Sequence, residues 1–126
     1  MQRDLDLIRK IMHALEEKME YGKNFQSDKL FEIMKDESPS MGKLSYHIGL
    51  LVEGGLIKVK EYKYQSGEPT DYLINTITSE GHDFIDIIRQ DNTWNIIKEK
   101  AFVIGGFSIS LLLDIGKEYL KKKIGI

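Results

Sequence analysis

Apolar residues near the start of the chain recur every three or four positions, which is the spacing of one face of an α-helix. This stripe comprises Leu5, Ile8, Met12, Leu15 and Met19. Charged residues fill the opposite face, and Gly22 follows where such a helix would end. The pattern predicts an amphipathic helix from about Asp4 to Glu20.

Two more helices are predicted before residue 56. Ser27 and Asp28 are N-cap residue types, and they precede an apolar cluster at 30–34. A third helix is predicted to begin at Ser38-Pro39, because serine caps helices and proline fits the first helical position. Gly54-Gly55 is predicted to end it, since glycine adopts the left-handed conformation that closes a helix. Its inward stripe comprises Met41, Leu44, Ile48, Leu51 and Val52.

The period then changes from helical to alternating. In residues 56–64, Ile57 and Val59 are predicted to face one side, with Lys58 and Lys60 on the other. Turn-forming residues follow at 65–69, and residues 71–77 are again rich in β-formers. The pattern predicts a β-hairpin with a polar tip.

Three helices are predicted after the hairpin. The fourth helix of the chain starts after Thr78, an N-cap residue type, and Asp91-Asn92-Thr93 is predicted to break it. A fifth helix carries Trp94, Ile97 and Ala101, with Trp94 as a core anchor. Gly105-Gly106 separates it from a last helix, predicted from Phe107 to about Lys123.

This order of elements is that of a winged helix-turn-helix. We predict an α+β fold with three helices, a β-hairpin wing and further C-terminal helices. Residues 1–92 are predicted to form the winged helix-turn-helix domain, and residues 93–126 a C-terminal helical extension. Another small α+β domain is the alternative.

Composition limits the class of protein. The chain has 126 residues, a net charge of −2 and no Cys, which favours one domain and excludes disulfide scaffolds and thiol catalysis. The N-terminal segment carries Asp4 and Asp6 where a signal peptide would need a basic segment followed by an apolar run, so a cytoplasmic location is predicted. Residues 98–126 carry 6 basic and 3 acidic side chains, whereas residues 1–97 carry 12 and 17. Residues 1–97 are therefore acidic overall, and residues 98–126 are basic overall.

Two short motifs resemble winged-helix regulators. Leu51, Gly55 and Leu56 match the L..(A)GL(I/V) pattern at the junction of recognition helix and strand, with Gly54 where alanine is usual. That glycine is expected to loosen the helix end slightly. The segment ITSEG at 77–81 resembles the LTxxG that leads from wing to helix.

A longer resemblance covers nearly the whole chain. It is similar to an uncharacterised family of small bacterial and prophage winged-helix proteins in RDLDLIRKI, YHIGLLVEGGLI, TSEGHDFIDIIRQDNTWNIIKEK and YLKKKIGI. The resemblance implies a winged-helix fold and a phage or mobile-element context, and it implies no particular biochemical activity.

A DNA-binding winged helix uses its third helix in the major groove and its wing on the backbone. Helical geometry places Gly42, Ser45, Tyr46, Gly49 and Glu53 on the outward side of the third helix, with Lys43 at its edge. Few of these side chains suit base readout. The predicted DNA-binding residues are Ser40, Lys43, Ser45, Tyr46, Lys58, Lys60, Lys63 and Gln65.

Other interpretations of these residues stay open. Lys58, Lys60 and Lys63 equally suit a solvated strand surface that protects a sheet edge. His47 is predicted to be packed or to cap, with pH sensing as the alternative. His82 and Asp86 are predicted to pair on one helix face, with a metal or acid–base site as the alternative. No metal or cofactor is predicted, and the absence of nucleotide-binding and hydrolase motifs predicts that the protein is not an enzyme.

The last helix has apolar residues nearly all round and so must be buried on more than one side. The uncharged run 101–113 is too short to span a membrane, and an interfacial helix anchored by Lys121–Lys123 is a weaker alternative. We predict a homodimer, with intramolecular packing alone as the alternative. The predicted dimerisation residues are Trp94, Phe107, Leu111, Leu112, Ile115 and Tyr119.

Two functional hypotheses follow from the sequence. The first is a small dimeric protein that binds double-stranded DNA, such as a phage or mobile-element regulator. The second is a winged helix used for contact with another protein, such as a phage accessory or host-modulating factor. The lysines of the hairpin favour the first, and the weak readout face of the third helix favours the second.

Overall fold

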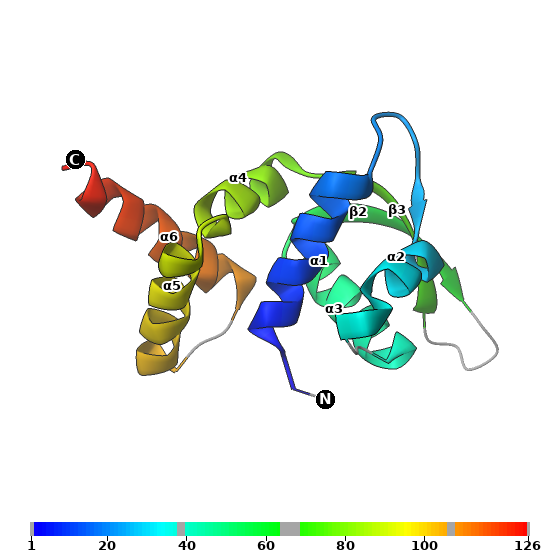
Figure 1. Cartoon of the computed structure of the whole chain (residues 1–126), viewed down its shortest axis with the longest axis horizontal. Coiled ribbons are helices and arrows are strands. Elements are labelled where there is room, and N and C mark those ends of the chain that lie inside the picture. The colour runs from blue at the N-terminus through cyan, green and yellow to red at the C-terminus, as the bar shows by residue number, and fades with distance from the viewer. Residues whose placement is uncertain (1, 38–39, 64–68, 106–107, 126) are drawn as a thin grey trace.

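The computed structural model describes residues 2–37, 40–63, 69–105 and 108–125, and only the backbone at 61–63 and 69–70. These residues form a mixed α+β fold (Figure 1). The helices are α1 (Leu5–Lys18), α2 (Ser27–Met34), α3 (Met41–Glu53), α4 (Ser79–Ile88), α5 (Asp91–Ile104) and α6 (Ile109–Lys123), with a 3₁₀ turn at Lys35–Glu37. The strands are β1 (Phe25–Gln26), β2 (Ile57–Lys63) and β3 (Pro69–Ile77). The predicted α+β class is confirmed.

The three strands form one antiparallel sheet in the order β1-β3-β2. The predicted hairpin is β2 and β3, and its predicted tip, including Gln65, lies mostly outside the described residues. Pairing shifts from Lys58 opposite Thr76 to Val59 opposite Ile74, so one residue of β3 is extra at this point. Strand β1 was not predicted, because two residues are too few to show an alternating pattern.

The predicted start of the third helix is wrong. Helix α3 begins at Met41, and the Ser40 hydroxyl caps it by accepting a hydrogen bond from the Lys43 N–H at 3.1 Å. The predicted cap at Ser38-Pro39 lies outside the described residues.

The predicted cap of α2 is also wrong. Helix α2 begins at Ser27, and Gln26 precedes it as N-cap residue without a side-chain bond. The Ser27 hydroxyl instead joins the sheet, because it donates to the Asp71 carboxylate and accepts from the Tyr72 N–H at 3.1 Å.

Two boundaries near the C-terminus also differ from the prediction. Asp91, Asn92 and Thr93 form the first turn of α5, so the break after α4 lies at 89–90. Helix α6 starts at Ile109 with Ser108 as its cap, and the predicted start at Phe107 lies outside the described residues. Gly105 ends α5 in the left-handed conformation with φ +82°, as the sequence predicts.

A junction at the base of the hairpin joins α3, both strands and α4. Thr78 caps α4 as predicted, since its hydroxyl accepts from the Gly81 N–H at 3.0 Å. The same hydroxyl donates to the Gly55 carbonyl at 2.6 Å, and the Thr78 N–H donates to the Leu56 carbonyl at 2.9 Å. Gly81 lies so close to Leu56 that a Cβ there would be 2.1 Å from the Leu56 carbonyl oxygen.

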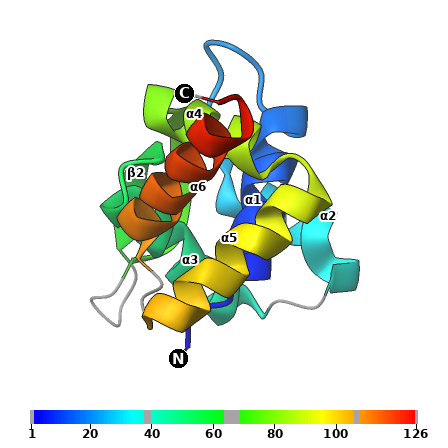
Figure 2. The same cartoon turned by 90° about the vertical axis from the view of Figure 1, so that its left-hand side faces the viewer.

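Both predicted parts of the chain share one hydrophobic core. Helices α5 and α6 lie side by side at one end of the molecule (Figures 1 and 2). Helix α6 approaches α4 closely at Gly116, where a Cβ would lie 2.4 Å from Ile87 Cγ2. Gly54 makes room for Ile109 of α6 in the same way, because a Cβ there would be 2.9 Å from the Ile109 side chain. The glycine expected only to loosen a helix end therefore permits close packing.

Polar contacts tie α5 to α1. The Trp94 indole N–H and the Lys98 ammonium both donate to Oδ1 of Asp6, each at 2.8 Å. The Trp94 ring is buried and meets Phe84 edge-on, with ring centroids 6.4 Å apart. The predicted role of Trp94 as a core anchor is confirmed. Among the residues that the structure describes, no helix has the length and apolar character needed to cross a membrane.

Gly81→Ala tests the junction. We expect the substitution to lower the free energy of unfolding by about 2–3 kcal/mol, because the new methyl group overlaps the Leu56 carbonyl. Gly42→Ala is the matched control, since nothing lies within 4 Å of its Cβ; it should raise stability by about 0.5–1 kcal/mol. Urea denaturation followed by circular dichroism measures both, and equal effects would contradict the close approach.

Asp6 makes stability depend on acid pH. The hydrogen bond from Lys98 lowers the pKa of Asp6 below its usual value; burial opposes this and the Trp94 indole adds to it. A carboxyl whose pKa is lowered in the folded state stabilises the fold above its unfolded pKa. We expect the free energy of unfolding to fall as pH drops below about 4, and Asp6→Asn to reduce this dependence. Asp83→Asn, on the exposed side of α4, serves as the control; parallel pH curves for wild type and Asp6→Asn would refute the role of Asp6.

Candidate nucleic-acid interface

Helix α3 is covered on two sides. Leu44, Ile48 and Leu51 are fully buried, as the predicted inward stripe requires. The sheet covers a further side, which the sequence predicts to face outward. Ser45 is only 6% exposed, and Gly49 lies against Tyr72, whose hydroxyl oxygen would be 3.2 Å from an added Cβ. The outward placement of Ser45 and Gly49 is therefore wrong, because β3 packs across that side of the helix.

The exposed surface of α3 is consequently narrow. Gly42, Tyr46 and Glu53 are exposed, and Tyr46 shows 37% of its surface. The Tyr46 ring meets the His47 ring edge-on, with centroids 5.3 Å apart and planes at 82°. This strip offers one aromatic hydroxyl and one carboxylate, and no exposed Lys or Arg on α3.

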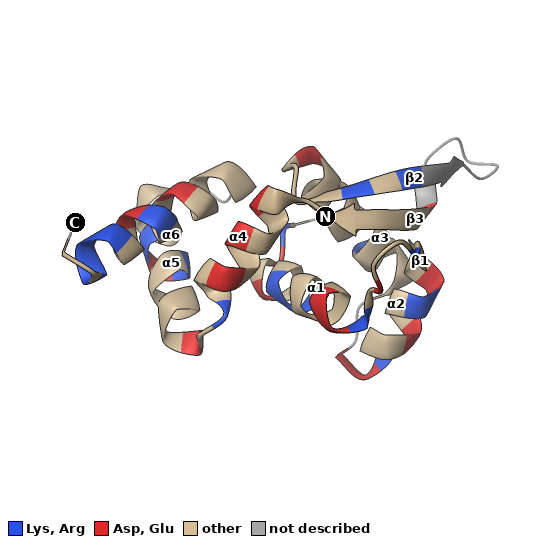
Figure 3. Cartoon of the chain, turned by 90° about the horizontal axis from the view of Figure 1, so that it is seen from above, with Lys and Arg blue, Asp and Glu red and all other residues tan. Residues whose placement is uncertain are grey.

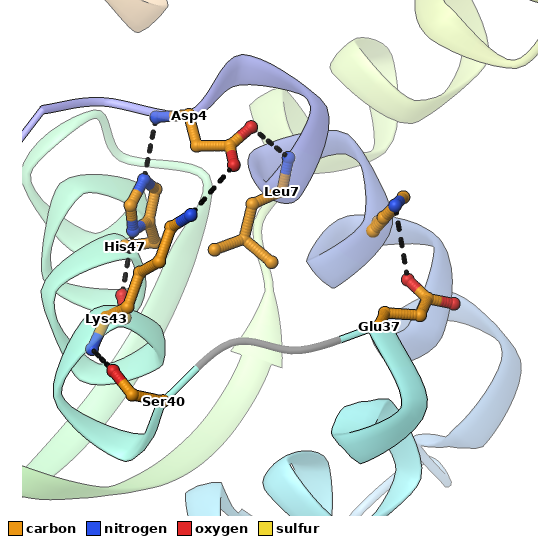
Figure 4. A network of polar contacts seen from close by, with 7 residues as sticks. Asp4, Leu7, Glu37, Ser40, Lys43 and His47 are labelled. Carbon is orange, nitrogen blue, oxygen red and sulfur yellow. Dashed lines mark hydrogen bonds and ion pairs between the residues drawn. The ribbon is translucent and has the colours of Figure 1, made fainter.

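Lys43, the basic residue of α3, is engaged with the N-terminal segment. Its ammonium lies 3.1 Å from Oδ2 of Asp4, and both side chains are 39% exposed (Figure 4). The other oxygen of Asp4 caps α1 by accepting from the Leu7 N–H at 3.1 Å. Burial acts to raise the pKa of Asp4, but the Leu7 and Lys43 hydrogen bonds outweigh it, so the pKa lies below its usual value. Asp4 thus remains an anion beside Lys43 at neutral pH.

His47 completes this network from the buried side of α3. Its side chain is fully buried, Nε2 accepts from the Asp4 N–H at 2.8 Å, and Nδ1 lies 2.7 Å from the Lys43 carbonyl oxygen (Figure 4). These partners assign the hydrogen to Nδ1, because a carbonyl oxygen only accepts and an amide N–H only donates. The prediction of a packed histidine is confirmed, and its role is to hold α1 against α3.

The other predicted basic contacts lie on the hairpin. Lys58 and Lys60 are exposed on β2, which is an edge strand of the sheet (Figure 3). Neighbouring Ile57 is buried and Val59 half-buried, so the predicted alternation holds in this part of the strand. The side chain of Lys63 and the whole of Gln65 lie outside the described residues.

Asp86, the predicted partner of His82 on α4, is bonded to an arginine. Asp86 lies 3.1 Å from the Arg89 guanidinium, which also forms two hydrogen bonds with the Glu16 carboxylate, at 3.0 and 2.8 Å. Arg89 lowers the pKa of Glu16 through these bonds. No cluster of His, Asp and Glu within the described ranges is suited to hold a metal ion.

The predicted dimerisation residues are mostly buried within the chain. Trp94, Leu112 and Ile115 are buried, Leu111 and Tyr119 are half-buried, and Phe107 lies outside the described residues. The premise that a small domain covers only one side of the last helix is wrong, because α4 and α5 both pack against α6.

The exposed apolar surface lies instead at the end of α5. Phe102, Val103 and Ile104 are 74%, 80% and 63% exposed. The sequence carries a signal for it, since three consecutive apolar residues at a helix end cannot all face one core.

His47→Ala tests the link between α1 and α3. We expect it to lower the free energy of unfolding by about 2–3 kcal/mol, because it leaves a cavity and removes the acceptor of the Asp4 N–H. His82→Ala is the matched control at an exposed site and should change stability by less than about 0.5 kcal/mol. Chemical denaturation compares them, and an unchanged midpoint for His47→Ala would rule out this role.

Comparison with known proteins identifies the family of this chain. A protein of Haemophilus influenzae (strain ATCC 51907 / DSM 11121 / KW20 / Rd), named "Uncharacterized protein", is 33% identical over 118 residues, covering 94% of this chain and 91% of the relative. No solved structure matches the chain. Residues 2–108 match the family described as "Hypothetical protein (DUF2513)". The chain therefore belongs to the DUF2513 family.

Proposed function

We propose that this protein is a winged helix-turn-helix that binds double-stranded DNA as a homodimer and does not act as an enzyme. The observation that supports it best is the arrangement of α2, α3 and the β2–β3 hairpin, with Lys58 and Lys60 exposed on the hairpin beside α3. The strand order β1-β3-β2 places β2, the lysine-bearing strand, at an open sheet edge. In this proposal α3 lies against the major groove and the hairpin contacts the backbone.

The side chains available favour backbone contact over base readout. Lys58 and Lys60 supply ammonium groups for phosphates, while the exposed strip of α3 offers Tyr46 near its N-terminal half. Phosphate contacts position a protein on DNA but carry little sequence information. Two or three such contacts for each protomer give weak, salt-sensitive binding, so a dimer is needed to double them.

The biological setting is part of the same proposal. The support for it is the similarity of the sequence motifs to those of small bacterial and prophage proteins, and we therefore propose a cytoplasmic transcriptional regulator of a phage or other mobile element. Its weak base readout fits a regulator that relies on two half-sites and on DNA shape.

Reversing the hairpin charges tests DNA binding. Lys58→Glu with Lys60→Glu should raise the dissociation constant for mixed duplex DNA at least tenfold and reduce the salt slope by about 2 for each protomer. Lys18→Glu with Lys23→Glu makes the same charge change at and just after the C-terminal end of α1, outside the hairpin, and should have a much smaller effect. Fluorescence anisotropy at about 50 mM salt measures both. No binding by the wild type at micromolar concentration would refute the DNA proposal.

A second candidate function is contact with another protein through α3. The observation that favours it is that Tyr46 lies exposed beside Gly42 and Glu53 while Lys43 is paired with Asp4, so this strip carries no free positive charge. Exposed aromatic residues of this kind are enriched at protein interfaces. Under this alternative Tyr46→Ala, which keeps the hairpin lysines, abolishes partner binding, whereas the Lys58 and Lys60 reversals do not.

A further inference from the structure

An open groove lies between helices α5 and α6, whose ribbons run side by side in Figure 2. The groove has a volume of about 700 Å³. Its apolar lining comes from both helices and comprises Ile96, Val103, Ile104, Ile115 and Tyr119. A groove of this size on a small protein is large enough to receive side chains of a partner.

The groove continues into the exposed end of α5. Val103 and Ile104 line the groove and are exposed at the end of α5, whereas Phe102 next to them does not line it. Val103 and Ile104 are 80% and 63% exposed although they are apolar, and exposed apolar side chains that line a groove mark an interaction surface. The core does not need them, because Trp94 and Ile97 already fill the buried side of α5.

The rim of the groove is acidic. Glu99, Asp114 and Glu118 line it together with Lys100. Among the described residues, none of these four side chains takes part in an ion pair within the chain. The rim therefore has unpaired negative charge around an apolar floor, and it suits a segment that combines lysines with apolar residues.

The chain itself carries such a segment at the end of α6. Lys121, Lys122 and Lys123 are exposed in its last turn, and Ile124 next to them is 67% exposed. Figure 3 shows the Lys residues gathered at this end of the molecule, while acidic residues lie further back along α6. The Lys123 ammonium lies 6.0 Å from the centroid of the Tyr119 ring, which lines the groove. Both halves of a complementary contact therefore adjoin one another on the molecule, as a two-fold symmetric interface requires.

We propose that the α5–α6 groove binds a second copy of this chain, with the lysine-bearing end of α6 of each copy against the acidic rim of the other. Val103 and Ile104 are buried at the centre of this interface, and the lysine–carboxylate contacts form its rim. The inference rests on the homodimer of the proposed function and names its surface. Trp94 and Leu112, which the sequence predicts as dimerisation residues, are buried and lie outside this surface.

Charge exchange between two variants tests this pairing. One variant carries Asp114→Lys and Glu118→Lys, and the other carries Lys121→Glu and Lys122→Glu. In a two-fold dimer each variant alone places like charges opposite one another, so its dissociation constant should rise at least tenfold. An equimolar mixture restores opposite charges in both contacts and should form a heterodimer as tightly as the wild type. Light scattering after size exclusion and native mass spectrometry measure mass and composition.

Further variants keep the test independent of folding. Val103→Ser should weaken the dimer without changing the circular dichroism spectrum, because the side chain lines the groove and is 80% exposed. Lys10→Glu with Lys18→Glu, on α1, is the charge-matched control and should leave the dimer intact.

DNA binding is measured separately, so loss of DNA binding with an intact dimer refutes only the DNA proposal. A wild-type chain that stays at its monomer mass of 14.6 kDa up to about 0.1 mM, well above the micromolar range of ordinary dimers, overturns the dimer and leaves the groove to a different protein. A dimer that none of the groove variants weakens, or a mixture that fails to associate, also overturns it.

Discussion

The fold depends on the close approach of Leu56 and Gly81 at the base of the hairpin. Thr78 bonds to backbone groups of Gly55, Leu56 and Gly81, so one residue fixes the end of α3, the start of β2 and the start of α4. Gly55 takes a left-handed conformation with φ +76°, which turns the chain sharply from α3 into the strand. Because Gly81 has no side chain, α4 can start directly against this turn and lead the chain toward α5 and α6.

Much of this architecture could be predicted from local patterns, because each local preference agrees with the tertiary contacts. Gly105 ends a helix and Thr78 begins one, as their residue types indicate. Contacts between distant segments could not be predicted in this way. Ser27 has the residue type of a helix cap, yet its hydroxyl bonds to β3, some 45 residues away along the chain. A cap and a sheet contact compete for the same hydroxyl, and only the assembled sheet decides between them.

The candidate interface on α3 depends even more on contacts between distant segments, which local patterns do not predict. A helical wheel treats a helix as having one inner and one outer side, but α3 is enclosed by α1 and by the sheet. Ser45 is therefore buried and Gly49 half-buried, although both lie away from the main apolar stripe. Lys43 has the right residue type for a phosphate contact, yet Asp4, far away in sequence, neutralises it. The sequence identifies candidate side chains correctly by type, while packing decides which of them remain available.

Trp94 gives the molecule an intrinsic optical reporter. It is the single tryptophan of the chain, and its indole is buried and bonded to Asp6 between α5 and α1. Its emission wavelength therefore responds to water reaching the seam between these two helices, while fraying of the hairpin leaves its surroundings unchanged. Undocking of the C-terminal helices can thus be followed separately from global loss of helix without adding a dye.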